Sequence, residues 1–295
     1  MSARHPVASS FTTSAPPTLR ADRTLARDRG ADPVATRDTA ADAPVELWRH
    51  AAWRALPWIL LLAFLSVLAQ VAAGDGLVHL DMALRDRLVS NGHWIGMTLP
   101  WRRETMDIAM LGQRGPTAVV GFAVAGWLAW RRRLWRPLLV MTASVLALNV
   151  VIGGLKILTD RPQPITGDPY LLAGGMQFPS GHASNVLLTW GVIAYLLWRY
   201  GQPRLPRAVG AGVVGVFSVA VALCSLYLGM HWLTDLIAGY LMAGLLLYGV
   251  VRLDAHPAPS GRFAQAVQRF FTVTDEAPAP RPNEPAPRPH PRPYA

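Results

Sequence analysis

Six mostly apolar runs, most of them separated by charged segments, restrict this chain to one class of fold. They cover residues 57–73, 116–130, 137–155, 182–198, 208–228 and 231–250. A helix that crosses a bilayer needs about 20 predominantly apolar residues, and each run approaches that length. Hydrophobic residues make up 52% of the chain and charged residues 16%, a balance typical of an integral membrane protein. The sequence therefore predicts an all-α integral membrane protein with six transmembrane helices in a bundle.

The segments between and beyond these runs define the predicted domains. Residues 1–50 have no apolar period and predict a disordered tail, whereas 51–252 form the six-span membrane domain. Residues 253–295 are rich in Pro and Arg and predict a second flexible tail, interrupted by a possible interfacial helix at 261–274. Residues 74–115 place leucines at helical spacing among charges, which predicts an amphipathic segment along the outer surface.

The distribution of arginine predicts the orientation of the protein in the plasma membrane. Arginines follow the second apolar run at 131–136 and the fourth at 199–207, so these loops and both termini are expected in the cytoplasm. The net charge of +10 lies in the tails and short loops and not along one face, which argues against nucleic acid as a partner. The single cysteine, Cys224, excludes a disulfide framework within the chain.

The start of the fourth apolar run has the composition of an anion site. Pro179 and the capping residue Ser180 precede Gly181 and His182, so backbone N–H groups and a hydroxyl are expected to face outward together. The helix dipole adds partial positive charge at the same place, and histidine exchanges a proton near neutral pH. These residues predict a phosphate site on the outer side of the membrane.

A second histidine supplies a candidate nucleophile. His231 and Asp235 are four residues apart at the start of the sixth run, where a helix would place them on one face. The carboxylate can hold one imidazole nitrogen protonated and leave the other to attack, while His182 serves as acid and then base. Because two imidazoles suit phosphoryl transfer and the chain lacks a carboxylate cluster, no metal and no cofactor are expected.

Cations should gather where the phosphate is bound, because phosphoryl transfer depends on charge neutralisation. Lys156 is the one lysine among 28 basic residues, and it ends the third apolar run. Arg161 follows in the loop. Lys156 and Arg161 are the predicted phosphate-binding cations, together with Ser180 and Gly181.

The order of these motifs resembles the membrane branch of the type 2 phosphatidic acid phosphatase family, which is related to vanadium-dependent haloperoxidases and acid phosphatases. The family pattern is Lys, six residues, Arg-Pro; then Pro-Ser-Gly-His; then Ser-Arg, five residues, His, three residues, Asp. The second part is intact at 179–182, and the third keeps His231 and Asp235. The resemblance implies that His231 attacks phosphorus, that Asp235 is its partner and His182 the acid, and that Lys156, Ser180 and the Gly181 amide hold phosphate oxygens.

Two positions depart from the family pattern. Gln163 stands where the first motif has arginine, and Ser225 stands where the third motif has its arginine. Losing one preorganised charge contact typically costs about two to three powers of ten in rate. A shifted Arg161 is one candidate replacement, and Arg102, Arg103 and Arg114 of the outer segment are the others.

The leading hypothesis is metal-independent hydrolysis of a lipid phosphate or diphosphate at the outer membrane face, through a phosphohistidine. A phosphotransferase that uses the same site is the first alternative. A non-catalytic protein that binds lipid phosphates is the second, since both family arginines are replaced. A transporter is disfavoured because the ionisable residues cluster at one face and not at the midplane. The identity of the lipid and the oligomeric state stay open.

Overall fold

The computed structural model describes residues 35–201 and 206–255, which are mostly helical. The chain divides into one unit that ends at residue 51 and another that begins at residue 52. Helix α1 (Ala35–Ala73) starts in the first unit, so residues 35–50 of the predicted tail lie in a helix. Residues 253–255 of the second predicted tail form the end of α9, and residues 1–34 and 256–295, which include the predicted interfacial helix at 261–274, lie outside the described residues.

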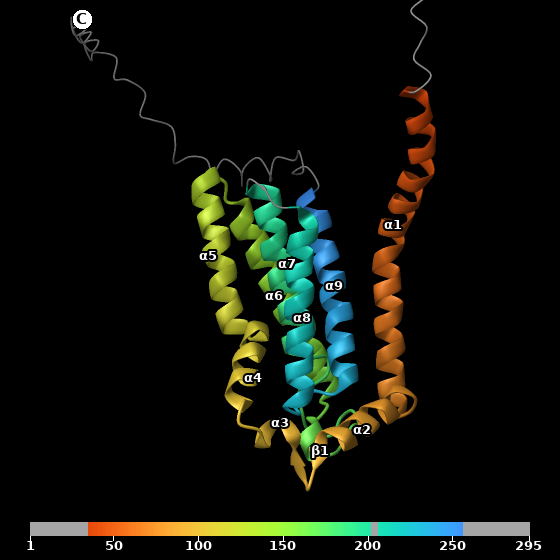
Figure 1. Cartoon of the computed structure of the whole chain (residues 1–295), viewed down its shortest axis with the longest axis vertical. Helices are drawn as coiled ribbons and strands as arrows, with labels where there is room; N and C mark the ends of the chain where they lie inside the picture. The colour runs from red at the N-terminus through yellow and green to blue at the C-terminus, as the bar shows by residue number, and fades with distance from the viewer. Residues whose placement is uncertain (1–34, 202–205, 256–295) are drawn as a thin grey trace, which may run out of the picture. The chain divides into compact units, whose positions relative to one another are not determined.

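Five further long helices run alongside one another in the second unit (Figure 1). They are α5 (Arg114–Arg132), α6 (Arg136–Thr159), α7 (Gly181–Tyr200), α8 (Arg207–Tyr227) and α9 (Leu233–Ala255). Helix α7 lies between the others, since it contacts α5, α6, α8 and α9. The core includes Phe64 of α1, Leu128 of α5 and Met141 of α6.

Four helices are long and apolar enough to cross a membrane: Ala51–Ala73 within α1, together with α6, α8 and α9. Helix α7 is less apolar because it carries Ser184, Asn185 and Thr189, all of them buried. Since neighbouring helices surround it, these groups bond to protein partners and do not face lipid. The protein is therefore a helical membrane protein with four candidate spans, and the assignment of α5 and α7 as the other two stays a prediction.

Small residues let α7 and α9 approach closely. A β-carbon at Gly239 of α9 would lie 2.7 Å from the backbone oxygen of Ser180 and 3.1 Å from Ser184 Oγ. The Ser184 hydroxyl also donates to the Gly239 carbonyl at 3.2 Å. Small residues and hydroxyls at a helix crossing are the usual means of close packing between membrane helices. This contact fixes the start of α7 against the start of α9.

The arginines used to predict orientation gather at one end of the bundle, which we call the arginine end (Arg132, Arg136, Tyr200 and Asp254). Arg132 donates to the Tyr200 and Gly201 carbonyls, each at 2.6 Å. Arg136 Nε pairs with the buried Asp254 carboxylate at 2.7 Å, and Tyr200 donates to the same carboxylate at 2.7 Å. These bonds join the last turns of α5, α7 and α9 to the start of α6.

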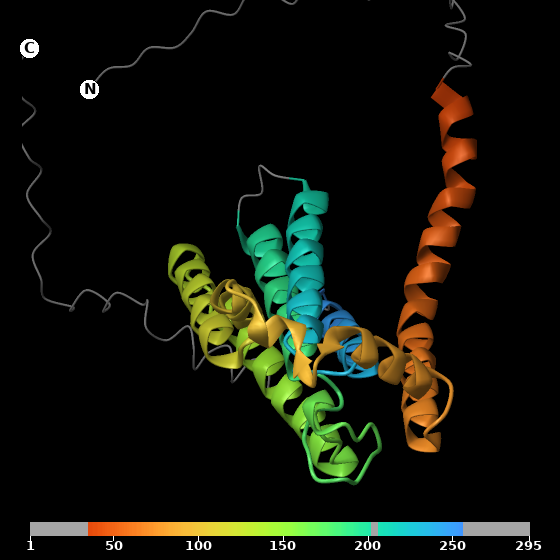
Figure 2. The ribbon, with the colours of Figure 1, turned by 60° about the horizontal axis from the view of Figure 1, so that its bottom comes forward.

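The segment between α1 and α5 crosses the opposite end of the bundle (Figure 2). It contains α2 (Leu77–Leu88), the strands β1 (Val89–Ser90) and β2 (His93–Trp94), α3 (Ile95–Thr98), α4 (Arg102–Ala109) and the 3-10 turn η1 (Met110–Gly112). The strands pair antiparallel, with Val89 opposite Trp94, so the fold is not strictly all-α. A second 3-10 turn, η2 (Pro164–Thr166), lies in the loop between α6 and α7.

Candidate active site

Two histidines from distant parts of the chain meet at the end of the bundle opposite the arginine end. His182 is the second residue of α7, and His231 lies in the turn between α8 and α9. Nδ1 of His182 is 3.3 Å from Nε2 of His231. His182 is half-buried, whereas His231 is 4% exposed. The structure thus brings together the two imidazoles that the sequence proposed as a pair.

The position of His231 differs from the sequence prediction. It was expected at the start of a helix, with Asp235 one turn later, but α9 begins only at Leu233. The two side chains still meet, with His231 Nδ1 3.5 Å from Asp235 Oδ2, because Asp235 turns back over the first turn of α9 and accepts from the Trp232 N–H at 3.0 Å. Nε2, the other ring nitrogen, faces His182.

Burial sets the protonation of His231. Desolvation lowers its pKa, and the Asp235 carboxylate opposes that shift without cancelling it. Because a histidine with a lowered pKa is neutral at physiological pH, one of its ring nitrogens carries a lone pair. Asp235 Oδ2 is the carboxylate oxygen beside Nδ1, although Nδ1 forms no hydrogen bond within the described residues. A proton held on Nδ1 by this carboxylate would leave the lone pair on Nε2, as in a catalytic triad.

Ser180 caps α7 as the sequence predicts. Its Oγ accepts from the Ala183 N–H at 3.2 Å, and its own backbone N–H donates to the Asp235 carbonyl at 2.8 Å. The second bond joins the start of α7 to the segment that carries His231. Gly181 follows as the first helical residue, so its backbone N–H belongs to the first turn, where helix N–H groups have no intrahelical acceptor.

Lys156 lies beside this helix start. It occupies the last turn of α6, and its ammonium donates to the Met176 carbonyl in the loop before α7. A β-carbon at Gly181 would be 4.0 Å from Lys156 Nζ and 3.8 Å from Nη2 of Arg114. Two cations therefore approach the first residue of α7. Lys156 is a predicted phosphate-binding residue, and Arg114 is one of the candidate replacements for the family arginines.

Arg161 does not have the position expected of a phosphate-binding residue. Its side chain is 0% exposed, and Nε donates to the Pro169 carbonyl at 2.7 Å. Nη1 pairs with Asp235 at 2.7 Å, and Nη2 pairs with Asp81 at 2.9 Å. The guanidinium is thus enclosed between two carboxylates, because the loop after α6 turns it toward α2 and α9. Arg161 contacts the partner of His231 and not the space beside Gly181.

Asp81 was missed by sequence reasoning. This residue of α2 is 1% exposed, accepts from the Thr234 N–H at 3.0 Å and pairs with Arg161. Desolvation raises its pKa, although hydrogen bonds from Thr234 and the charge of Arg161 oppose the shift. A signal was available in the sequence, because an acid four residues after Leu77 and three before Leu84 lies on the apolar face of an amphipathic helix.

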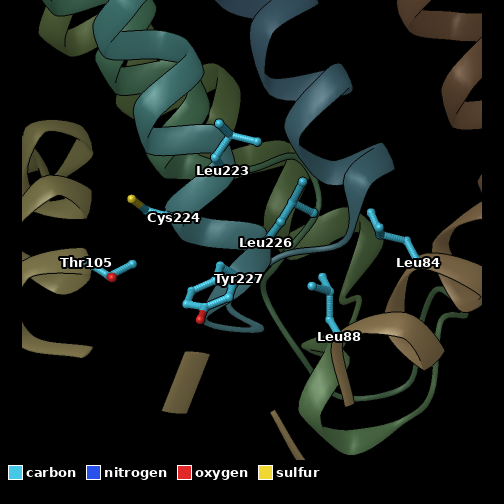
Figure 3. Close-up of a pocket in the computed structure, with 7 residues that line it drawn as sticks. All are labelled: Leu84, Leu88, Thr105, Leu223, Cys224, Leu226 and Tyr227. Carbon is cyan, nitrogen blue, oxygen red and sulfur yellow. The ribbon is translucent and has the colours of Figure 1, made fainter. Parts of the chain in front are cut away.

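An apolar pocket of about 350 Å³ lies between α2, α4 and the end of α8 (Figure 3). Leu84, Leu88, Thr105, Leu223, Cys224, Leu226 and Tyr227 line it. None of these side chains carries a charge at neutral pH, so the pocket is not suited to a phosphate. Within the described ranges, no three His, Cys, Asp or Glu residues cluster closely enough to hold a metal ion.

The chain is similar to known membrane phosphatases in sequence and in fold. A model of the PAP2 superfamily matches residues 133–256. The chain is 30% identical over 158 residues to phosphatidylglycerophosphatase B of Bacillus subtilis (strain 168), an alignment that covers 52% of this chain and 75% of the relative. It is also similar to the crystal structure of a transmembrane PAP2-type phosphatidylglycerolphosphate phosphatase from Bacillus subtilis. That similarity has a TM-score of 0.56 and 25% identity, and covers 68% of this chain and 96% of the other.

Proposed function

Because this chain belongs to the PAP2 superfamily of membrane phosphatases, we propose that it hydrolyses a lipid phosphate or diphosphate through a phosphohistidine on His231. The observation that carries the proposal is the 3.3 Å contact between His182 Nδ1 and His231 Nε2 at the start of α7. In this proposal His231 is the nucleophile and His182 the proton donor, and helix N–H groups and two cations lie beside them. No metal ion is needed, because these side chains supply the charge and the proton transfers.

The reaction has two steps. His231 Nε2 attacks phosphorus, the bond from phosphorus to the lipid oxygen breaks, and His182 gives its proton to that oxygen. His182 then takes a proton from water, the water oxygen attacks the phosphohistidine, and the N–P bond breaks to release phosphate. Because the two rings are in contact, a phosphoryl group must separate them. His182 is the more exposed ring and is the one expected to move.

The residues around Gly181 are assigned to phosphate binding. Lys156 and the Gly181 N–H contact phosphate oxygens, and the Ser180 hydroxyl, which accepts from Ala183, can still donate its own proton. Arg161 is reassigned as a positioning residue, since it holds Asp235 through Nη1. It acts on His231 through that carboxylate, and the direct phosphate contact first expected of it is given up.

The proposed topology follows from the two ends of the bundle. With α5 and α7 as spans, the membrane domain (51–252) crosses six times, and the arginine end faces the cytoplasm together with both termini. His182 and His231 then face the outer side of the plasma membrane. The bilayer delivers the substrate, a phosphorylated membrane lipid whose headgroup is at the membrane surface.

Replacing Gly181 by alanine tests the phosphate site, because the substitution should impair phosphate binding without changing the stability of the fold. The new β-carbon would lie 3.5 Å or more from its nearest neighbours, an ordinary contact, so the fold should be retained. Its methyl group would occupy the space between Lys156 and Arg114. We expect phosphate release to fall by about 100-fold because the phosphate is displaced, whereas the unfolding temperature is unchanged. Gly115→Ala, at a position with nothing within 4 Å, is the matched control, and equal activity of both variants would contradict the assignment.

The function is tested by phosphate release from a panel of lipids, assayed with purified protein in detergent. The panel contains phosphatidylglycerol phosphate, phosphatidic acid and a polyprenyl diphosphate, each with and without a chelator. We expect release of inorganic phosphate from at least one lipid, unaffected by the chelator. Loss of activity in chelator would refute the metal-independent mechanism, and transfer of phosphate to another lipid or a sugar would indicate a phosphotransferase.

One observation favours a second function. Gln163 and Ser225 occupy both family arginine positions, and the Ser225 hydroxyl is buried without a hydrogen-bond partner in the described part of the chain. A site with fewer cations could bind lipid phosphates without turning them over. Saturable binding of the same lipids with no phosphate release would establish that alternative.

A further inference from the structure

The proposed phosphate site lacks positive charge where its family places it. Ser225 is 0% exposed in α8, and its short side chain is uncharged, so it cannot supply the positive charge of the family arginine. Gln163 is exposed and uncharged, and it precedes η2 in the loop after α6. Lys156 is then the one cation supplied by the three motifs that lies beside Gly181, because Arg161 is enclosed between Asp81 and Asp235. A doubly charged phosphate would be poorly neutralised by a single ammonium.

Arg114 supplies a second cation from outside the motifs. It is the first residue of α5, its side chain is exposed, and its Nη2 is 3.8 Å from the position of a β-carbon on Gly181. It is close enough to interact electrostatically with both Lys156 and His182. Arg102 and Arg103, the other candidates, show no such approach among the described contacts.

The charges around Arg114 are not balanced by the protein. Within the described residues, its guanidinium forms no hydrogen bond or ion pair, although the Lys156 ammonium is nearby. Asp235, the acid that interacts electrostatically with Lys156, is already paired with Arg161. Two neighbouring cations without a shared counterion repel each other, and an anion bound between them would remove that repulsion. The charges of Lys156 and Arg114 therefore favour the binding of an anion between them.

The start of α5 is held in place by α7. The Asn185 side chain donates to the Gly112 carbonyl at 3.0 Å and to the Thr117 hydroxyl at 2.6 Å. Trp190 Nε1 donates to the Leu111 carbonyl at 3.0 Å. These bonds fix the backbone on both sides of Arg114, so the guanidinium is presented from a rigid support. Preorganisation of this kind makes a charge effective in phosphoryl transfer.

We propose that Arg114 binds a non-bridging oxygen of the phosphate at Gly181 and replaces the arginine charge absent at Gln163 and Ser225. The inference rests on the proposed function, because it uses the same phosphate site. It adds a phosphate-binding residue that belongs to none of the three motifs. Arg114 and Lys156 then contact the phosphate from two different helices, α5 and α6.

The test compares Arg114→Ala, Arg114→Lys and the control Arg103→Ala, which removes another exposed arginine of the outer segment. Two quantities are measured on purified protein: the affinity for inorganic orthovanadate, which resembles the phosphoryl group in transfer, and the rate of phosphate release from the lipid panel. We expect Arg114→Ala to lose about 100-fold in both, Arg114→Lys to recover part of the loss, and Arg103→Ala to match the wild type. The unfolding temperature should be unchanged in all three.

The outcomes separate this inference from the proposed function. Wild-type affinity for vanadate in Arg114→Ala would overturn the inference, as would an equal loss in Arg103→Ala, which would indicate a general effect of surface charge. Absence of vanadate binding by the wild type would overturn it as well. If the wild type binds vanadate through Arg114 but releases no phosphate from any lipid, the assignment of Arg114 stands and the proposed hydrolysis fails.

Discussion

His231→Ala is expected to reduce phosphate release by about 10⁴-fold or more, to the level of the background reaction. The proposed mechanism requires a covalent bond between phosphorus and Nε2 of this residue, and the remaining site residues cannot form that bond in its place. Knocking out one member of a nucleophile and base pair costs about as much as removing the whole unit in serine hydrolases, and the same non-additivity applies here. Phosphate release by purified protein measures the loss directly.

The control is His93→Ala, because His93 is exposed in β2 and the proposed reaction does not involve it. His231 is almost fully buried, so the fold of the alanine variant must be checked by its unfolding temperature and its elution volume in detergent. A folded His231→Ala protein that released phosphate at the wild-type rate would refute the assignment of the nucleophile.

How far sequence alone could predict this protein depends on the range of the interactions. The start of α7 was predictable, since the cap at Ser180 forms with Ala183, three residues away. The meeting of His182 and His231 was predictable from topology, because both residues belong to the same end of the bundle. The charged loops from which the orientation is predicted are also local features of the sequence, and Arg132 and Arg136 lie at one end of the bundle.

The rest depended on contacts that spacing does not encode. Arg161 was expected at the phosphate because it follows Lys156 closely, but its direction is set by Asp81, 80 residues earlier in the chain. The helical period predicted His231 inside a span, whereas the turn at Gly229, with φ +66°, delays α9 until Leu233. Arg114 approaches Gly181 only because η1 packs on α7. Each difference arises from long-range packing that overrides a local pattern.

Arg161→Ala is expected to destabilise the protein by about 3–5 kcal/mol, the typical cost of removing one partner from a buried ion pair. The substitution leaves the carboxylates of Asp81 and Asp235 buried and close to the same vacant space. Thr234 Oγ1 also loses its contact with Nη1. Thermal unfolding in detergent measures the loss, with the exposed Arg87→Ala of α2 as control.

The pH dependence of that loss identifies its cause. Desolvation already raises the pKa of Asp81, and removal of the guanidinium, which lowers it, raises it further. A carboxyl whose pKa is higher in the folded state than in the unfolded state stabilises the fold while it is protonated. This contribution to folding stability is lost as the pH rises through the folded pKa. The loss of folding stability in Arg161→Ala should therefore be smaller at about pH 5 than at about pH 8. Adding Asp81→Asn to the Arg161→Ala protein should recover part of the lost stability. If Arg161→Ala instead kept its unfolding temperature at both pH values and lost only phosphate release, Arg161 would contact the phosphate directly and its role in positioning Asp235 would be wrong.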